Sequence, residues 1–362
     1  MNKLGFGFMR LPLLENGELD LEQCTKMVDA FMEAGFNYFD TAHNYLGGKS
    51  ELGLKACLTS RYPRESYVLT NKLTYTFFEQ QEEIAPLIDT QLEACGVDYF
   101  DYCLVHTITA KNYEKHVRCQ SFKELQKLKE QGKIRHIGFS FHDQPEFLEK
   151  VILENPEVEV VQIQFNYLDA ANPDVKSMGC YEVCRKYGKP VLVMEPVKGG
   201  ALANLPPKAA AVLDALDGGS HASYAIRYAA SQEGILKVLS GMSTPEQVQD
   251  NISFMKDFQP LNEQELAALN QVREIIMEQE TVGCTACRYC VDGCPQNILI
   301  PDLFQQYNKK VVYMDHGWDY GDLVKENGKA SDCVGCGQCE EICPQHLPIR
   351  EWLKKVAAVF EK

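Results

Sequence analysis

Eight of the fifteen cysteines fall into two runs that share one spacing. Each run reads C-x2-C-x2-C-x3-C-P, the first ending at Pro295 and the second at Pro344. Three thiolates spaced by two residues wrap one [4Fe-4S] cubane from a tight loop, while a fourth, held off by three residues and followed by a proline, ligates the neighbouring cluster. The spacing therefore predicts two [4Fe-4S] clusters in the last part of the sequence.

In this ligand assignment, the fourth cysteine of each run binds the cluster of the other run. One cluster is expected to take Cys284, Cys287, Cys290 and Cys343, and the other is expected to take Cys333, Cys336, Cys339 and Cys294. The alternative is a pair of four-thiolate zinc sites, for which a C-x2-C pair recurring at a distance is the usual signature. Four cysteines in one close run, found twice and each time with a proline, favour iron-sulfur over zinc.

The two runs resemble the motif of two-cluster bacterial ferredoxins. A long insert separates them, from Gln296 to Asp332, and its residues 300–307 predict a short helix with Pro301 near the first turn. With this insert, the region is more similar to the helical ferredoxin domains fused to larger oxidoreductases than to a minimal ferredoxin. The resemblance implies a small, mostly helical iron-sulfur domain.

A second set of reactive side chains lies upstream, at the ends of successive apolar runs. Asp40 and Tyr45 follow one run, Lys72 ends the next, and His106 ends the third. A buried Asp beside a Lys stabilises the ammonium, and that charge lowers the pKa of a neighbouring phenol. We therefore expect Lys72 to bring the pKa of Tyr45 from about 10 toward neutrality. Tyr45 is then suited to protonate a carbonyl oxygen as hydride arrives on its carbon.

These side chains need a scaffold that gathers successive strand ends. Short β-rich runs alternate with helical stretches from Leu4 to about Lys256. The expected strands are residues 4–9, 38–40, 68–71, 102–105, 136–140, 160–165, 190–194 and 236–240. Eight strands alternating with helices over roughly 250 residues predict an α/β fold of the (β/α)8 TIM-barrel type, with the chemistry where the strands end.

Together the four side chains resemble the catalytic tetrad of the aldo/keto reductase family. The similarity covers about 250 residues, the length of one TIM barrel. It implies that Tyr45 is the general acid/base, that Lys72 and Asp40 tune it, and that His106 orients the carbonyl.

The same resemblance implies contacts to a nicotinamide cofactor. Ser140 and Gln164, in Ile-Gly-Phe-Ser and Val-Gln-Ile-Gln-Phe-Asn, are expected to hold the carboxamide, with Asn166 supporting them. Met194 stands where an aromatic residue commonly stacks on the nicotinamide, and a thioether also packs against a ring. Lys198 either meets a cofactor phosphate or is a solvated side chain.

The segment Leu239–Asn251 resembles the family's cofactor-phosphate segment. A Ser/Thr cap, a proline in the first turn and free backbone N–H groups suit an anion, although a well-capped helix without a ligand has the same features. Family members that prefer NADPH carry an arginine or lysine just after the glycine, where this chain has Met242 and Ser243, so NADH and NADPH both stay open. The expected contacts are Gly241, Ser243, Thr244, Gln247 and Asn251.

Composition limits the classes of partner. The net charge of -15 disfavours nucleic acid, and no apolar run approaches the ~20 residues that cross a bilayer. The N-terminal residues lack a secretory signal, so a cytoplasmic location is expected. Residues 1–260 are expected to form the barrel, and residues 261–362 a linker helix followed by the two-cluster domain.

Three hypotheses for function follow. In the first, an NAD(P)H-dependent barrel exchanges hydride with a small carbonyl or alcohol substrate, while the clusters pass electrons to or from a carrier such as ferredoxin or flavodoxin. Because hydride carries two electrons and each cluster moves one, the second hypothesis adds FMN, the usual converter, at the phosphate site after strands seven and eight. In the third, the clusters are a structural or oxygen-sensing module on a reductase or on a barrel that only binds partners.

Overall fold

The computed structural model describes residues 2–172, 175–216, 218–284, 286–314, 317–343 and 345–361, without the side-chain surroundings of Tyr313 and Trp318. Pro344, which closes the second predicted cysteine motif, lies outside these residues. The chain divides into two units, Met1–Leu205 with Leu213–Leu269, and Pro206–Val212 with Asn270–Lys362. The division falls inside helix α11 (Glu263–Met277), whereas the expected domain boundary follows residue 260.

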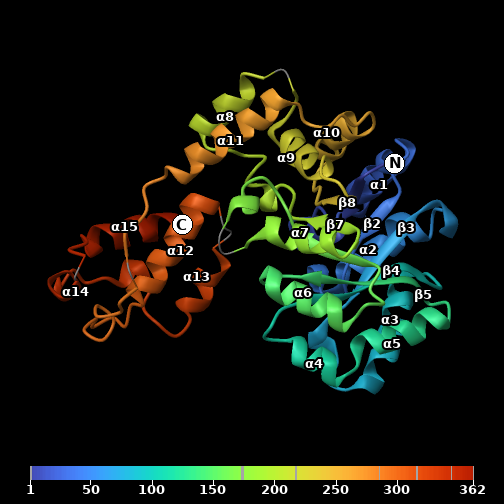
Figure 1. Ribbon diagram of the computed structural model, residues 1–362, viewed down its shortest axis with the longest axis horizontal. Helices are drawn as coiled ribbons and strands as arrows, with labels where there is room; N and C mark the ends of the chain where they lie inside the picture. Colours follow the sequence, from blue (N-terminus) through green and yellow to red (C-terminus); the bar gives the residue numbers. More distant parts are fainter. Residues whose placement is uncertain are drawn as a thin grey trace. The chain divides into compact units, whose positions relative to one another are not determined.

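The first unit is a closed barrel of eight parallel strands in sequence order, as the sequence predicts (Figure 1). All eight expected strands are present; β3, β4 and β5 are longer than expected, and β1 ends at Gly7 instead of Met9. The strands are β1 (Leu4–Gly7), β2 (Tyr38–Asp40), β3 (Val68–Leu73), β4 (Phe100–Ile108), β5 (Ile134–Phe141), β6 (Val160–Gln164), β7 (Val191–Met194) and β8 (Ile235–Ser240).

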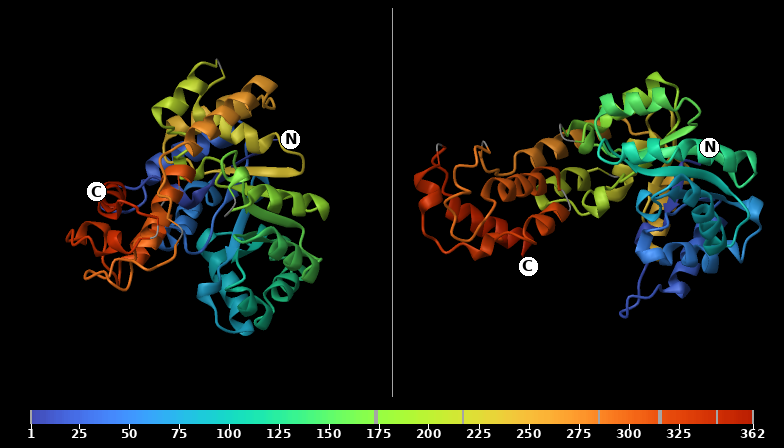
Figure 2. Two further views of the ribbon diagram at one scale, coloured as in Figure 1. Left: turned by 60° about the vertical axis from the view of Figure 1, so that its left-hand side comes forward. Right: turned by 90° about the horizontal axis from the view of Figure 1, so that it is seen from below.

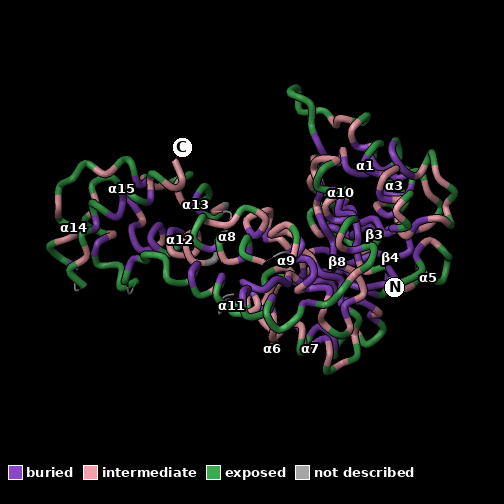
Figure 3. Tube along the Cα trace, turned by 90° about the horizontal axis from the view of Figure 1, so that it is seen from above, coloured by how far each residue is buried: buried purple, intermediate pink, exposed green. Residues whose placement is uncertain are grey.

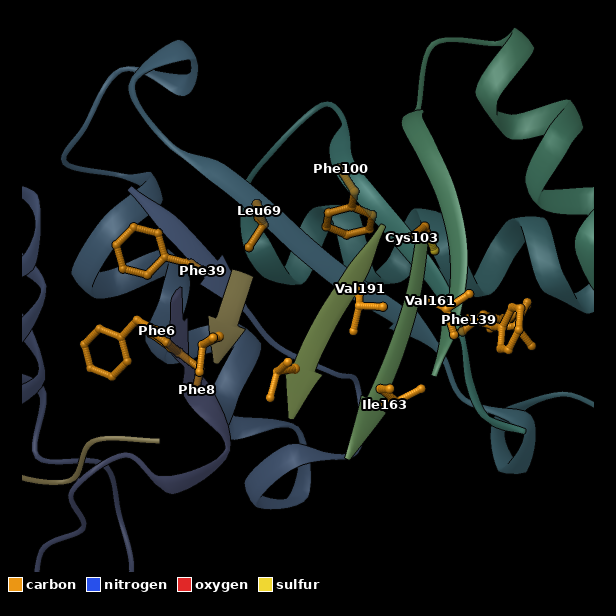
Figure 4. Packing of buried hydrophobic residues seen from close by; sticks show 14 of the residues in the cluster. Phe6, Phe8, Phe39, Leu69, Phe100, Cys103, Phe139, Val161, Ile163 and Val191 are labelled. Carbon is orange, nitrogen blue, oxygen red and sulfur yellow. The ribbon is translucent and has the colours of Figure 1, made fainter. Parts of the chain in front are cut away.

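Helices follow the strands and cover the outside of the barrel (Figure 2). Phe6 and Phe39 point outward from β1 and β2 and pack on Phe31 of the first helix, with ring centroids 5.5 Å apart in both pairs (Figure 4). The helices of this unit are α1 (Leu21–Glu33), α2 (Lys49–Leu54), α3 (Ile84–Cys95), α4 (Tyr113–Arg118), α5 (Ser121–Glu130), α6 (Pro145–Glu154), α7 (Ser177–Lys186), α9 (His221–Ala230) and α10 (Pro245–Met255).

The barrel interior is built in layers because strand side chains alternate between two faces. One buried cluster inside the barrel contains Tyr38, Leu104, Val160, Leu192 and Leu239. Asp40 follows Tyr38 by two residues and His106 follows Leu104 by two, so on β2 and β4 the next inward position toward the carboxyl end is polar. This alternation places reactive side chains directly above an apolar floor.

The second unit is mostly helical, as predicted, and its buried residues line the inner faces of its helices (Figure 3). Leu303 and Phe304 pack with Ile349 and Leu353 in one core. The helix predicted at residues 300–307 starts at Ile300 with a proline in its first turn, but it runs on to Tyr313. The helices are α8 (Pro207–Asp214, which crosses the division), α12 (Ile300–Tyr313), α13 (Trp318–Leu323), α14 (Gln338–Glu341) and α15 (Ile349–Phe360).

Candidate active site and iron-sulfur centres

The ammonium group of Lys72 is at the centre of the polar layer. Its Nζ lies 2.6 Å from Asp40 Oδ1 and 2.8 Å from the carbonyl oxygen of Thr41, and the side chain is fully buried. The same Nζ is 4.8 Å from the centroid of the Tyr45 ring. The His106 ring meets that of Tyr45 edge-on, with 5.9 Å between centroids and 73° between planes. The barrel thus brings the four predicted side chains together.

Strand register and one irregularity in the strand pairing place these groups. Asp40 pairs with Thr70 across β2 and β3, which sets Lys72 one inward position higher. The β4–β5 pairing is irregular between Val105 and Ile108, where Thr107 has a φ of 57° and donates its N–H to Ser140 Oγ at 2.7 Å. An irregularity of this kind re-aims neighbouring side chains at the end of a strand.

Burial and charge determine the protonation of Lys72 and His106. Although burial opposes its charge, the Asp40 carboxylate and the Tyr45 oxygen raise the pKa of Lys72, which stays an ammonium. Burial, followed by the charge of Lys72, lowers the pKa of His106 well below its usual value, so the imidazole is neutral at pH 7. A neutral imidazole donates from one ring nitrogen and accepts at the other.

The pKa of Tyr45 shifts in the direction opposite to the one expected from the sequence. Burial raises the pKa of Tyr45, and the nearby Lys72 ammonium offsets only part of this effect. The expectation was wrong because it counted the cation and left out the loss of solvent around the phenol. At neutral pH Tyr45 therefore carries its proton and is a donor.

The buried carboxylate of Asp169 connects three of the side chains expected to bind the cofactor. Its Oδ2 accepts hydrogen bonds from Gln164 Nε2 at 2.6 Å and from Asn166 Nδ2 at 2.7 Å. Its Oδ1 lies 2.8 Å from Lys198 Nζ. Lys198 is only 4% exposed, so the alternative in which it is a solvated side chain is wrong. Residues from the ends of β6 and β7 are tied together here.

The groups beside this carboxylate fit a nicotinamide carboxamide. Gln164 pairs with Met194 across β6 and β7. Within the described part of the chain, Gln164 Oε1 accepts no hydrogen bond. Ser140 Oγ accepts from Thr107, which leaves its own hydroxyl hydrogen to donate. An amide acceptor and a hydroxyl donor match the NH2 and C=O groups of a carboxamide.

The expected phosphate segment runs from the end of β8 into helix α10. The Thr244 hydroxyl caps this helix by accepting from the N–H of Gln247, and Pro245 occupies its first turn. The N–H of Ser243 donates to Gln247 Oε1 at 2.7 Å, and its hydroxyl donates to the carbonyl oxygen of Arg10 at 2.6 Å.

Two further residues of this segment have structural contacts. A Cβ added at Gly241 would lie 3.4 Å from the Arg10 side chain, so the backbone at Gly241 runs close to that side chain. Asn251 is buried and donates to Ser240 Oγ at 2.7 Å, which braces α10 against β8. The helix N-terminus itself offers a positive dipole to an anion.

The second unit contains two small cavities, each lined by four of the predicted cysteines. Among the described residues, no group of three or more His, Cys, Asp or Glu side chains converges closely enough to hold a single metal ion. Four thiolates around one cavity match the ligand set of a [4Fe-4S] cubane. One cavity is lined by Cys284, Cys287, Cys290 and Cys343, and the other by Cys294, Cys333, Cys336 and Cys339.

Comparison with protein families gives the same division of the chain. A model described as the aldo/keto reductase family matches residues 3–274. The chain belongs to the aldo/keto reductase family. A second model, of the 4Fe-4S dicluster domain, matches residues 283–348. The chain is therefore an oxidoreductase of the aldo/keto reductase type with an iron-sulfur domain.

Relatives and solved structures agree with this assignment. The chain is 26% identical to L-galactose dehydrogenase of Arabidopsis thaliana (78% of this chain, 89% of the relative) and 26% identical to the NADH-specific methylglyoxal reductase of Escherichia coli (66% and 84%). Its fold is similar to that of an aldo-keto reductase of Bacillus halodurans in its holo form (TM-score 0.62, 22% identity, covering 75% of this chain and 91% of the other). It is also similar to a Klebsiella pneumoniae enzyme in complex with NADPH (TM-score 0.61, 19% identity, 75% and 90%).

Sequence reasoning missed three residues of the barrel site. Gln162 donates to Asp40 Oδ2 at 3.4 Å, and Thr74 forms a 2.7 Å hydrogen bond with His106 Nδ1. Gln162 precedes Gln164 by two residues and Thr74 follows Lys72 by two, so extending the inward-facing alternation by one position finds both. Asp169 lies on a short turn after β6, outside the two-residue alternation of a strand, so that alternation could not predict it.

Replacing Lys72 with Met is expected to raise the pKa of Tyr45 further, because the phenolate loses its neighbouring cation. Alcohol oxidation requires the phenolate, so the pH at which kcat/KM for alcohol oxidation reaches half its maximum moves upward, and the rate near neutral pH falls on the order of 10²-fold. A pH profile of Lys72→Met beside Lys72→Arg, which keeps the charge, measures this. An unshifted profile in the Met variant contradicts the assignment.

Replacing Asp169 with Asn is expected to lower the free energy of unfolding by about 3–5 kcal/mol, because Lys198 is left as a buried charge without its partner. Asp214→Asn is the control, since it removes a carboxylate that is 66% exposed and lies 2.8 Å from His221 Nε2. Such an exposed pair contributes about 0–1 kcal/mol. Chemical denaturation of the two variants measures the difference, and equal losses would refute the role of the buried pair.

Proposed function

We propose that the barrel interconverts small carbonyl compounds and alcohols with NADPH or NADH, and that Tyr45 is the proton donor. The observation that carries this proposal is the buried ammonium of Lys72, which contacts the Asp40 carboxylate and lies against the Tyr45 ring. A protonated phenol beside a fixed cation donates readily to an oxygen that gains negative charge. The neutral His106 ring meets the Tyr45 ring edge-on, so both side chains belong to one site.

The side chains have separate tasks in this proposal. The bound nicotinamide supplies the hydride. Tyr45 gives its proton to the carbonyl oxygen, and Lys72, held by Asp40, stabilises the phenolate that results. His106 donates a hydrogen bond that orients the carbonyl. In the direction of alcohol oxidation the same groups act in reverse, with Tyr45 as the base.

Cofactor binding is assigned to the ends of β5 to β8. Ser140 and Gln164 hold the carboxamide with Asn166 supporting them, Met194 packs on the ring, and Lys198 meets a cofactor phosphate. The phosphate segment contributes Gly241, Ser243, Thr244, Gln247 and Asn251. The similar Klebsiella enzyme binds NADPH and the E. coli relative is NADH-specific by name, so both nucleotides are represented around this chain.

We also propose two [4Fe-4S] clusters with the ligand sets that line the two cavities. When bound, such clusters supply single-electron transfer. Cys287 and Cys336 are exposed, so each ligand set reaches the surface, where a carrier such as ferredoxin or flavodoxin has access. Cys290, Cys339 and Cys343 belong to the apolar core of the unit, which favours a structural role for the clusters as well.

The comparisons give no support to FMN, and we leave it out of the proposal. The helices in the described part of the chain include none with the length and apolar character of a membrane span.

The names of two relatives, L-galactose dehydrogenase and methylglyoxal reductase, describe reactions on a small alcohol and a small carbonyl compound. That substrate class suits a site formed around one phenol and one imidazole.

Replacing Tyr45 with Phe tests the proposed proton donor. With NADPH and methylglyoxal as the probe pair, kcat is expected to fall about 10²–10⁴-fold, because the variant lacks the hydroxyl that donates the proton. The Kd for NADPH, measured by quenching of protein fluorescence, stays within about twofold, since the phenol is no part of the proposed nucleotide site. Tyr75→Phe, a nearby tyrosine outside the tetrad, is the control. Full turnover by Tyr45→Phe would rule out this mechanism.

A pair of double variants tests the exchange of cysteines between the runs. Cys294→Ala with Cys333→Ala removes two ligands of one proposed cluster, so anaerobically purified protein is expected to keep about four of about eight iron atoms. Cys290→Ala with Cys294→Ala takes one ligand from each cluster and is expected to lose iron from both. Iron analysis and electron paramagnetic resonance give the readout. The reverse pattern means that each run holds its own cluster, and zinc in the wild type excludes both versions.

A further inference from the structure

Thr74 lies directly after β3 and is almost completely buried, with 4% of its surface exposed. Its hydroxyl oxygen is 2.7 Å from His106 Nδ1. Thr74 precedes a 3-10 turn (Tyr75–Phe77), but its side chain does not cap that turn. In the described part of the chain, the hydroxyl thus has the imidazole as its one hydrogen-bond partner.

The contact follows from the register of two neighbouring strands. Leu73 pairs with Val105 across β3 and β4, so Thr74 and His106 each come one residue after a paired position. Thr70 and Lys72 of β3 and Thr74 directly after it follow one another at intervals of two, the spacing of side chains on one face of a strand. Thr74 is therefore part of the same polar layer as the tetrad.

A neutral imidazole has a single proton, and the group bonded to one ring nitrogen decides where it lies. Burial and Lys72 keep His106 neutral. If the proton were on Nδ1, the Thr74 oxygen would accept the hydrogen bond from Nδ1, and the lone pair of Nε2 would face the carbonyl oxygen. The lone pair of Nε2 would then repel the lone pairs of the carbonyl oxygen, on which negative charge develops.

We propose that the Thr74 hydroxyl donates its hydrogen bond to His106 Nδ1 and so keeps the imidazole proton on Nε2, which donates a hydrogen bond to the substrate carbonyl oxygen. This inference rests on the proposed function of the tetrad. Thr74 touches neither substrate nor cofactor in this scheme, and it acts through His106 as a positioning residue. No proton leaves Thr74 during the reaction, because its hydroxyl only fixes the tautomer.

Kinetics of three variants test the proposal. Thr74→Val keeps the shape of the side chain and removes the donor, so kcat/KM for methylglyoxal reduction is expected to fall on the order of 10²-fold. Thr74→Ser restores the donor and is expected to stay within about threefold of the wild type. Thr70→Val is the matched control, since its hydroxyl is buried on the same strand and bonds Tyr38 at 2.6 Å, away from His106. The Kd for NADPH is expected to be unchanged in all three.

Nitrogen chemical shifts of histidine report the tautomer directly. In ¹⁵N-histidine-labelled holoprotein, with the His106 signals identified by their loss in His106→Gln, Nδ1 is expected to be unprotonated and Nε2 protonated. Thr74→Val is expected to shift this distribution toward protonated Nδ1.

The outcomes separate this inference from the proposed function. A wild-type proton on Nδ1 overturns the inference, and so does near-normal activity of Thr74→Val alongside an inactive His106→Gln. A loss of activity as large in Thr70→Val as in Thr74→Val also overturns it, because general destabilisation then explains both. If Tyr45→Phe and His106→Gln both keep full activity, the proposed function itself fails.

Discussion

The ion pair between Lys72 and Asp40 is the interaction on which the barrel site depends. Both side chains are buried, and an ammonium without a partner at this depth would cost several kcal/mol. Only the closed barrel places the Asp40 carboxylate 2.6 Å from Lys72 Nζ and the Thr41 carbonyl 2.8 Å from it. Folding and chemistry are therefore linked, since only the folded barrel holds this ammonium buried beside the Tyr45 ring, where it stabilises the phenolate.

The same logic of buried charge recurs at the end of β6. Asp169 is fully buried. Its carboxylate accepts hydrogen bonds from Gln164, Asn166 and Lys198, which come from the ends of β6 and β7. Backbone strain accompanies this site, because Glu195 and Lys198 both have positive φ angles, of 57° and 47°. Strained residues of this kind persist where surrounding contacts fix them, and they gather at functional sites.

Much of this arrangement could be predicted because strands alternate strictly between two faces. The eight strands, the (β/α)8 barrel and the positions of Asp40, Tyr45, Lys72 and His106 follow from apolar runs and the polar residues that end them. The direction of the pKa shift of Tyr45 could not be predicted, because it depends on how completely the phenol loses solvent. The partner of Lys198 was hidden for another reason, since Asp169 lies on a turn far from it in sequence.

The protein combines a site suited to two-electron hydride chemistry with a domain suited to single electrons, and the account depends on the first. The most direct measurement is a single turnover of oxygen-free holoprotein with NADPH that carries deuterium at its transferable position and with methylglyoxal, followed by mass spectrometry of the product. The account predicts one deuterium on the new carbinol carbon. A reduced product without deuterium on carbon, or NADPH oxidation without any reduced carbonyl product, would contradict it.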